Sequence, residues 1–142
     1  MNSDKSKMNN ISLLGSGARR IVYDLGNGYV LKVAKSKYGI KSNKREVNTY
    51  RSSPSPLRKR LAEIIDYGNH YRWLIMKKHT RKFPNSSKHK RNLYKLRIMF
   101  KSNGIRAYEV LTRRGKPNYE NLRVNRNGKI VVIDYGNFKF HR

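Results

Sequence analysis

The stretch Asn121–Gly136, NLRVNRNGKIVVIDYG, contains the pattern on which the expected fold depends. The apolar residues of Leu122–Val124 and of Lys129–Ile133 form two short β-rich runs, which predict two strands. The four residues that separate them end in Asn-Gly, a dipeptide typical of tight hairpin turns. We therefore expect a hairpin that begins just after Asn121 and delivers Asp134 at its end.

The two polar residues at the ends of this hairpin carry oxygen atoms of the kind that Mg²⁺ prefers. At sites that act on phosphates, Mg²⁺ is held by a few carboxylate or amide oxygens together with the phosphate groups. Asn121 and Asp134 can supply such a pair. The alternative is purely structural, because an Asn-Gly turn and an aspartate at a strand end also occur without any ligand.

The rest of the 142-residue chain predicts a single α+β domain. Five further runs are β-rich and are bounded by glycine- or proline-containing turns, while two segments have apolar residues at helical spacing. We expect a flexible polar tail over 1–10, one domain over 11–142 and an irregular connection over 107–119. The expected strands are Ile11–Leu14, Arg20–Leu25, Tyr29–Ala34, Leu61–Tyr67 and Tyr71–Lys77, and the expected helices are Ser42–Arg51 and Lys88–Asn103.

Lysine and arginine dominate the charge of the chain. There are 34 of them against eight acids, which gives a formal net charge of +26. Between Tyr67 and Tyr108 there are twelve Lys or Arg residues and no acid. Such a field favours an anionic macromolecule as partner, either nucleic acid or an acidic protein surface, or at least phosphate groups. The alternative is a solvated basic surface that only keeps the protein soluble.

The composition also excludes several classes of protein and site. The chain has no cysteine, so it has neither disulfides nor thiolate metal sites, and its four histidines lack the spacing of a zinc site. No apolar stretch reaches the roughly 18–20 residues that a membrane span needs. The first ten residues lack the apolar segment of a secretion signal. We therefore expect a cytoplasmic protein without a membrane partner.

The segments before the hairpin resemble the nucleotide-binding motifs of the protein kinase-like superfamily. Gly15-Ser16-Gly17, with Arg20 and Val22 after it, is similar to the glycine-rich loop G-x-G-x-x-G-x-V, although Arg20 replaces the third glycine. In kinases the backbone of this loop closes over the nucleotide phosphates. The resemblance implies that Gly15, Ser16, Gly17 and Val22 lie at the nucleotide, whereas Gly-x-Gly alone also forms ordinary turns.

Lys32, in Val30-Leu31-Lys32, resembles the lysine of the V-A-I-K strand motif. Glu46 follows it on an expected helix and is the only acid between Asp24 and Glu63. In kinases an acid at this place pairs with the strand lysine and holds it toward the α- and β-phosphates. The resemblance implies these roles for Lys32 and Glu46, and an unrelated surface pair is the alternative.

The segment Trp73–His79, WLIMKKH, resembles the fifth strand and the hinge of a kinase. In the family, backbone groups of the hinge meet the adenine edge. The resemblance implies that Lys77 and Lys78 lie beside the base and that Met76 limits the back of its pocket. A buried strand with a basic exit is the alternative, and nothing in the local sequence separates the two.

The end of the chain resembles the catalytic loop and the metal-binding motif of kinases. Pro117–Leu122, PNYENL, is similar to K-P-E-N-L, and Asp134-Tyr135-Gly136 is similar to D-F-G. The resemblance implies that Asn121 and Asp134 bind Mg²⁺. It also implies that phosphoryl transfer would depend on Asp134 together with Lys32 and Glu46.

Two features depart from the family pattern. The aspartate that orients the acceptor hydroxyl should stand five residues before Asn121, where this chain has Lys116. Glu109 takes that place if the loop contains an insertion; otherwise the base is absent, as in a pseudokinase. Only six residues follow Gly136, so we expect neither an activation segment nor a helical substrate lobe.

The resemblance implies a kinase-like architecture of two lobes. The expected N-lobe spans 11–79, with a five-stranded antiparallel sheet and a helix, and a much reduced C-lobe spans 80–142, with one main helix and the catalytic-loop hairpin. ATP and Mg²⁺ are the implied ligands, bound in the cleft between the lobes.

Three functions are compatible with these motifs. The first is a minimal kinase-like regulator or weak phosphotransferase. The second is a basic module, built on a degenerate kinase scaffold, that binds nucleic acid or an acidic protein. The third is an active small-molecule or protein kinase that uses Glu109 or a water molecule in place of the aspartate.

Overall fold

The computed structural model describes residues 11–140, so the expected tail over 1–10 lies outside the described residues. The described chain is α+β, as predicted. It divides into two compact units. The sheet unit contains the residues up to Lys44 together with Ile64–Lys78, and the C-terminal unit contains Arg45–Glu63 together with the residues from His79 onward. The lobe boundary expected after residue 79 stays a prediction.

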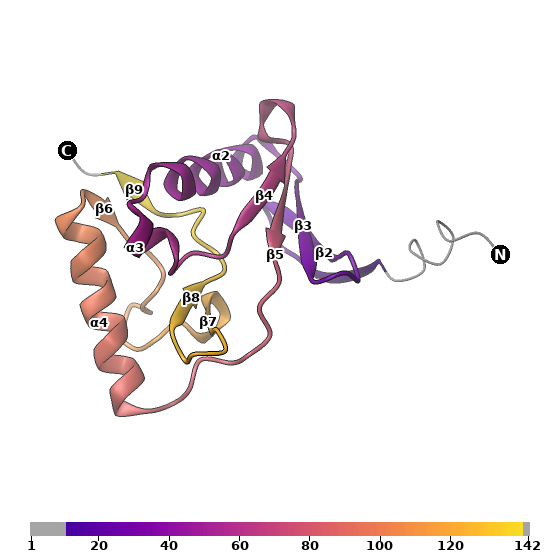
Figure 1. Ribbon diagram of the computed structural model, residues 1–142. Coiled ribbons are helices and arrows are strands. Elements are labelled where there is room, and N and C mark those ends of the chain that lie inside the picture. The colour runs from indigo at the N-terminus through magenta and orange to yellow at the C-terminus, as the bar shows by residue number, and fades with distance from the viewer. Residues whose placement is uncertain (1–10, 141–142) are drawn as a thin grey trace. The chain divides into compact units, whose positions relative to one another are not determined.

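The sheet unit is built around five strands in the order β1-β2-β3-β5-β4 (Figure 1). All neighbouring strands are antiparallel, which confirms the predicted five-stranded antiparallel sheet. A β-bulge in β1 and another in β4 interrupt the register locally. The strands are β1 (Ser12–Ser16), β2 (Arg20–Asp24), β3 (Tyr29–Ala34), β4 (Ile64–Tyr67) and β5 (Trp73–Lys77).

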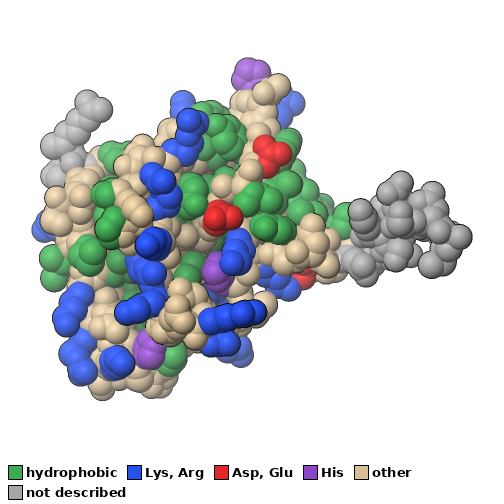
Figure 2. Space-filling model, viewed as in Figure 1, with side chains coloured by type: hydrophobic (Ala, Val, Ile, Leu, Met, Phe, Trp, Pro, Cys, Tyr) green, Lys and Arg blue, Asp and Glu red, His purple; other side chains and the backbone are tan. Residues whose placement is uncertain are grey.

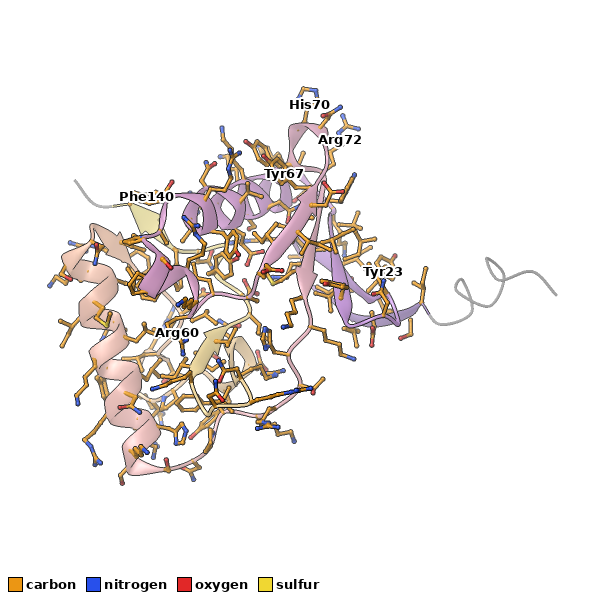
Figure 3. All side chains as sticks on the ribbon, in the orientation of Figure 1. Tyr23, Arg60, Tyr67, His70, Arg72 and Phe140 are labelled. Atoms are coloured by element: carbon orange, nitrogen blue, oxygen red, sulfur yellow. The ribbon has the colours of Figure 1, made fainter. Side chains whose placement is uncertain are left out.

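The turn between β4 and β5 contains two residues with a left-handed backbone, His70 and Tyr71. It contains a 3₁₀ turn, η1 (Asn69–Tyr71), in which His70 has a positive φ of 59°. A Cβ on Gly68 would lie 2.2 Å from the indole nitrogen of Trp73, so only glycine fits there. Figure 3 shows His70 and Arg72 at the end of this hairpin.

Helix α2 (Lys37–Ser52) begins five residues before the expected start at Ser42. The missed first turn contains Gly39, which lowers helix propensity by about 1 kcal/mol relative to alanine. Glycine is required at this point because a Cβ on Gly39 would lie only 2.1 Å from the carbonyl oxygen of Arg19. The residue before the helix, Ser36, caps it: its hydroxyl accepts a hydrogen bond from the backbone nitrogen of Gly39 at 3.4 Å.

The C-terminal unit consists of short strands and two helices besides the end of α2. The predicted hairpin is confirmed, with Leu122 opposite Val132 and Val124 opposite Ile130. A further strand pair, which the sequence did not predict, joins Ile105 to Phe140. The elements are α3 (Ser55–Arg58), α4 (Ser87–Ser102), β6 (Ile105–Arg106), η2 (Tyr119–Asn121), β7 (Leu122–Val124), β8 (Ile130–Val132) and β9 (Lys139–Phe140).

Helix α4 has the apolar periodicity that predicted it, and its ends agree with the prediction to within one residue. Leu93, Leu96 and Phe100 are buried, and the ring of Phe100 meets that of Phe138 edge-on with 5.4 Å between centroids. Ser86 caps the N-terminus by accepting a hydrogen bond from the backbone nitrogen of His89. None of the helices in the described part of the chain has the length and hydropathy needed to span a bilayer.

Candidate functional site

The glycine-containing turn joins β1 to β2 in the sheet unit. The backbone nitrogen of Gly17 donates to the carbonyl of Arg20 at 3.0 Å, and Gly15 lies opposite Val22. Neither Gly15 nor Gly17 has a positive φ, and a Cβ at either position would meet nothing within 4 Å. Neither the backbone nor the packing of the chain therefore requires glycine here. An open backbone of this kind fits a ligand that must approach closely.

Lys35 contacts the same turn, although the sequence patterns did not indicate it. Its Nζ donates to the hydroxyl of Ser16 at 3.3 Å and to the carbonyl of Gly17 at 3.0 Å. Its backbone nitrogen donates to the carbonyl of Arg19 at 2.8 Å. Lys35 comes directly after β3 and three residues after Lys32. That position was the only feature of the sequence that could have indicated its contact with the turn. The turn thus has a cation within hydrogen-bond distance.

Lys32 occupies a buried position at the centre of the sheet. It lies between Val22 of β2 and Leu74 of β5, and its exposed fraction is only 4%. Burying an ammonium group without a polar partner is strongly unfavourable. Within the described residues, no buried side-chain nitrogen or oxygen lacks a hydrogen-bond partner. A buried, partnered lysine in a central strand differs from the exposed lysines elsewhere in this basic chain.

The three predicted hinge residues differ in their surroundings. Met76 is buried, with Val30 and Ile64 opposite it on the two neighbouring strands, whereas Lys77 is exposed. Lys78 follows β5, and its backbone nitrogen donates to the carbonyl of Gly28 at 2.8 Å. Contact of these residues with an adenine ring stays a prediction.

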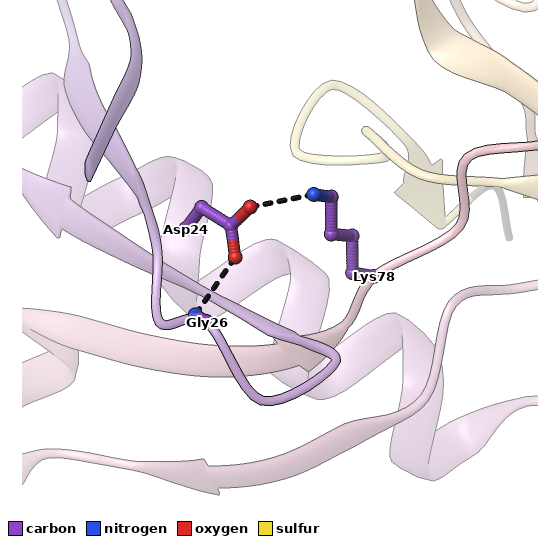
Figure 4. A network of polar contacts seen from close by, with 3 residues as sticks. All are labelled: Asp24, Gly26 and Lys78. Carbon is purple, nitrogen blue, oxygen red and sulfur yellow. Dashed lines mark hydrogen bonds and ion pairs between the residues drawn. The ribbon is translucent and has the colours of Figure 1, made fainter. Parts of the chain in front are cut away.

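Lys78 also forms an ion pair with Asp24, 2.5 Å from Nζ to Oδ2 (Figure 4). The other carboxylate oxygen of Asp24 accepts a hydrogen bond from the backbone nitrogen of Gly26 at 2.9 Å. These two hydrogen bonds hold the pKa of the Asp24 carboxyl below its usual value, the bond from Lys78 being the larger cause. Lys78 therefore fastens the turn between β2 and β3 to the end of β5.

In the C-terminal unit, Glu46 holds the Asp-Tyr-Gly segment. Its side chain is fully buried, and Oε2 accepts a hydrogen bond from the backbone nitrogen of Tyr135 at 2.7 Å. The hydroxyl of Tyr135 donates to the carbonyl of Ala62 at 2.8 Å. These two contacts fix the residue that follows Asp134, and thereby the position of Asp134 itself. The bond from Tyr135 to Glu46 was not foreseen in the sequence.

Glu109, Asn121 and Asn137 form a hydrogen-bonded cluster in the same unit. The amide of Asn121 donates to the carbonyl of Glu109 at 3.0 Å, and the amide of Asn137 donates to Glu109 Oε2 at 2.5 Å. Glu109 has a φ of 70°, a left-handed conformation that is rare outside glycine and that concentrates at functional sites. Asn137 was missed because an asparagine after D-Y-G has no distinctive pattern.

A small hairpin over residues 111–117 explains how Glu109 approaches Asn121. Leu111 and Pro117 form a bridge, and the backbone nitrogen of Asn118 donates to the carbonyl of Val110 at 2.9 Å. The residues between Val110 and Asn118 therefore fold out of the loop. Counted along the sequence, the residue five positions before Asn121 is Lys116. If the seven residues of the closed hairpin (111–117) are left out of the count, the residue five positions before Asn121 is Glu109.

Asn121 and Asp134 carry oxygen atoms of the kind that a phosphate-bound Mg²⁺ takes, and their binding of the ion stays a prediction. Because the amide nitrogen of Asn121 is bonded to Glu109, its Oδ1 is the atom suited to a metal. The described residues include no group of three or more His, Asp or Glu that could hold a metal by themselves. A set of one amide and one carboxylate needs further ligands, and nucleotide phosphates supply them in Mg²⁺ sites.

The predicted site residues are thus shared between the two units. The glycine turn, Lys32 and the hinge belong to the sheet unit, whereas Glu46, Glu109, Asn121 and Asp134 belong to the C-terminal unit. The ion pair expected between Lys32 and Glu46 stays a prediction.

Solved structures of WbdD are similar to this chain in fold. The bifunctional kinase-methyltransferase WbdD aligns with a TM-score of 0.66 and 14% identity over 87% of this chain. WbdD with the kinase inhibitor LY294002 gives a TM-score of 0.64, 14% identity and 89% coverage, and a third WbdD structure gives 0.65, 13% and 92%. The chain spans about a third of the WbdD chains, 31–33%.

No protein-family model matches the sequence. No curated protein matches it either. At identities of 13–14% the likeness to WbdD concerns the fold alone, and the fold that it suggests is kinase-like.

Proposed function

We propose that this protein is a minimal kinase-like phosphotransferase that binds ATP with Mg²⁺ and uses Glu109 as the acid of its catalytic loop. The observation that carries the proposal is the cluster of Glu109, Asn121 and Asn137, closed by the hairpin over 111–117. That cluster restores the spacing at which kinases hold the acid and the metal-binding asparagine. The C-terminal unit then acts as a reduced C-lobe, with α4 as its main helix.

The remaining residues take the roles that the kinase motifs assign. The open backbone of Gly15–Gly17 faces the nucleotide phosphates, and Lys32 pairs with Glu46 and neutralises the α- and β-phosphates. The backbone after Met76 meets the adenine edge. Asn121 and Asp134 would hold Mg²⁺, which when bound would supply positive charge against the charge that develops on the phosphates during transfer.

Glu109 can receive the proton of the acceptor. Asn137 occupies Oε2 of the carboxylate, so Oε1 is the atom that would accept a hydrogen bond from an acceptor hydroxyl. As that hydroxyl oxygen bonds to the γ-phosphorus and the bond to the β-γ bridging oxygen breaks, the hydroxyl proton passes to Glu109 and ADP leaves. General bases of this kind contribute roughly 10²–10⁴-fold to the rate.

Binding and transfer can be tested separately. Mg-ATP at about 100 times its dissociation constant should raise the free energy of unfolding by about 2.7 kcal/mol, measured as a rise in melting temperature. Failure of millimolar Mg-ATP to stabilise the protein would contradict nucleotide binding.

Transfer is measured with γ-labelled ATP and a panel of acceptors. Glu109→Gln should lose transfer while keeping the stabilisation by Mg-ATP, and Asp134→Ala should lose both. Glu120→Gln is the matched control, because Glu120 is an exposed acid in the neighbouring 3₁₀ turn. Equal activity of Glu109→Gln and Glu120→Gln would show that Glu109 is not the base.

A further inference from the structure

The hairpin over 111–117 presents three cations to solvent. Arg113, Arg114 and Lys116 are all exposed and stand within four positions of one another. The hairpin is well fastened: Thr112 and Lys116 are joined by a backbone hydrogen bond of 2.7 Å, and Gly115 donates to Thr112 at 2.9 Å. Three positive charges on a fixed scaffold form a better anion site than three on a loose chain.

Helix α4 extends this basic surface. The hydroxyl of Tyr94 donates to the carbonyl of Gly115 at 2.5 Å, so the hairpin contacts the middle of the helix. Arg91 and Arg97, three residues to either side of Tyr94, share its exposed face. The whole helix, SKHKRNLYKLRIMFKS, carries six Lys or Arg and no acid. In Figure 2, Lys and Arg side chains gather over α4 without an Asp or Glu among them.

Exposed aromatic rings flank the hairpin on both sides. Tyr108 and Tyr119 each have an exposed fraction of 43%, and they stand just before and just after the loop that the hairpin closes. The ammonium of Lys139 lies 5.8 Å from the ring centroid of Tyr108. Tyr119 packs edge-on against Phe83 and leaves its ring partly open to solvent. Exposed rings that flank a run of cations in the sequence supply the two components, stacking surface and positive charge, that proteins use to bind single-stranded nucleic acid.

We propose that the 111–117 hairpin and the exposed face of α4 form a docking surface for single-stranded nucleic acid. Arginine binds phosphate in a bidentate manner, and unpaired bases can stack on the two tyrosines. A duplex offers no unstacked bases, whereas a single strand offers an unpaired base beside every phosphate. Along the sequence, the acids nearest to the hairpin are Glu109, which accepts a hydrogen bond from Asn137, and Glu120.

This inference goes beyond the proposed function. Its test does not depend on whether the protein binds ATP or transfers phosphate. Binding is measured without nucleotide, as the fluorescence anisotropy of a labelled single-stranded oligonucleotide of about 12 nucleotides, a length within the usual site sizes. The variant Arg113→Gln/Arg114→Gln/Lys116→Gln is compared with Lys59→Gln/Arg126→Gln/Lys129→Gln. The control removes the same charge from exposed positions elsewhere in the C-terminal unit.

The hairpin variant should bind about tenfold more weakly or worse, and the control variant about twofold more weakly. Loss of three phosphate contacts should also reduce the slope of log K against log salt by about 2, since each contact contributes roughly 0.7. Equal losses in the two variants would overturn the proposal, because the binding would then depend on total charge alone. Failure of the unaltered protein to bind would overturn it as well.

A second pair of ligands tests the stacking. An abasic strand of equal length and charge should bind roughly fivefold more weakly or worse. Equal binding of the abasic strand, or of a polyglutamate peptide with the same number of charges, would overturn a nucleic-acid surface in favour of a general polyanion or acidic protein partner.

Replacement of Thr112–Lys116 by Gly-Gly guards against misfolding of the triple variant, because it keeps the bridge between Leu111 and Pro117 with a two-residue turn. It should lose oligonucleotide binding to the same extent, and full binding by this variant would overturn the proposal.

Discussion

Asn137 lies beside Glu109 without being part of any motif that the sequence displays. Its amide donates to Oε2 of Glu109, while the backbone of Glu109 accepts from Asn121. Asn137 therefore holds the carboxylate of Glu109, and Asn121 holds its backbone, which has a left-handed conformation. A base that must meet an acceptor hydroxyl within hydrogen-bond distance depends on such orientation.

Asn137→Ala should lower kcat for phosphoryl transfer by about tenfold, because the Glu109 carboxylate loses the donor that orients it. The KM for Mg-ATP should change less than kcat, since the hydrogen bond from Asn137 to Glu109 orients the base rather than a ligand of the nucleotide. Steady-state kinetics with labelled ATP separates the two parameters. Asn137→Asp would place a second carboxylate against Glu109 and should lower kcat further. A rise in KM at unchanged kcat would show that Asn137 serves binding instead.

The ion pair of Asp24 with Lys78 predicts a pH-dependent contribution to stability. Its carboxyl has a folded-state pKa below the ordinary value of 3.8, so the pair stabilises the fold above pH 3.8. This contribution disappears as the pH falls through the lower folded-state pKa. Asp24→Asn should therefore lower the denaturation midpoint in urea at pH 7, and the difference from the unaltered protein should shrink below about pH 4. A difference that stays constant as the pH falls from 7 to 2 would contradict this assignment.

At the scale of elements, regular periodicity was predictable and an interrupted helical pattern was not. The bounds expected for β3 are those found, and α4 was placed to within one residue, because each has a clean alternation or helical repeat. The β7–β8 hairpin was predictable from its Asn-Gly turn. The start of α2 was not predicted, because Gly39 in its first turn weakens the helical pattern even though Ser36 caps the helix.

The parts of the site that escaped prediction depend on contacts distant in sequence. The β6–β9 pair consists of two residues on each strand, too few for a pattern. The 111–117 hairpin gives no alternation, yet its closure decides whether Lys116 or Glu109 counts as the residue five positions before Asn121. The places of Asn121 and Asp134 next to the β7–β8 hairpin were predictable because the motif is local, while their binding of Mg²⁺ stays a prediction. The clamp from Glu46 to Tyr135 was not, because 89 residues separate the two.

Two glycine substitutions separate packing from ligand contact. Gly39→Ala should destabilise the fold by about 1–3 kcal/mol, because its Cβ would overlap the carbonyl of Arg19. Gly17→Ala should leave the free energy of unfolding within about 0.5 kcal/mol, because its Cβ meets nothing and its φ is ordinary. Gly17→Ala should nevertheless weaken the stabilisation by Mg-ATP. Unchanged Mg-ATP binding in Gly17→Ala would remove the glycine turn from the nucleotide site.

For the molecule as a whole, fold and chemistry rest on different kinds of support. The structural likeness concerns the fold, whereas the proposed activity depends on a few hydrogen bonds within one unit and on motifs divided between two. The net charge of +26 gives every part of the surface some affinity for anions. Variants of single charges are therefore informative only beside controls that remove an equal charge elsewhere.

The pairing of Lys32 with Glu46 is the prediction that joins the two units into one site. If the two side chains act as a pair, Lys32→Met and Glu46→Gln should each weaken Mg-ATP binding, and the double variant should be little weaker than either. The coupling energy from such a double-mutant cycle should reach about 1 kcal/mol or more. Glutamine at position 46 keeps an oxygen for the backbone nitrogen of Tyr135, so the clamp on that segment survives.

Lys35→Met combined with Glu46→Gln provides the control for this cycle. Lys35 contacts the glycine turn through Ser16 and Gly17, so its effect on Mg-ATP binding should add to that of Glu46 within about 0.5 kcal/mol. Isothermal titration of all six proteins with Mg-ATP gives both cycles. Additivity in the Lys32 cycle would mean that the two residues act independently. In that case the kinase-like motifs of the two units would not be joined through an ion pair between Lys32 and Glu46.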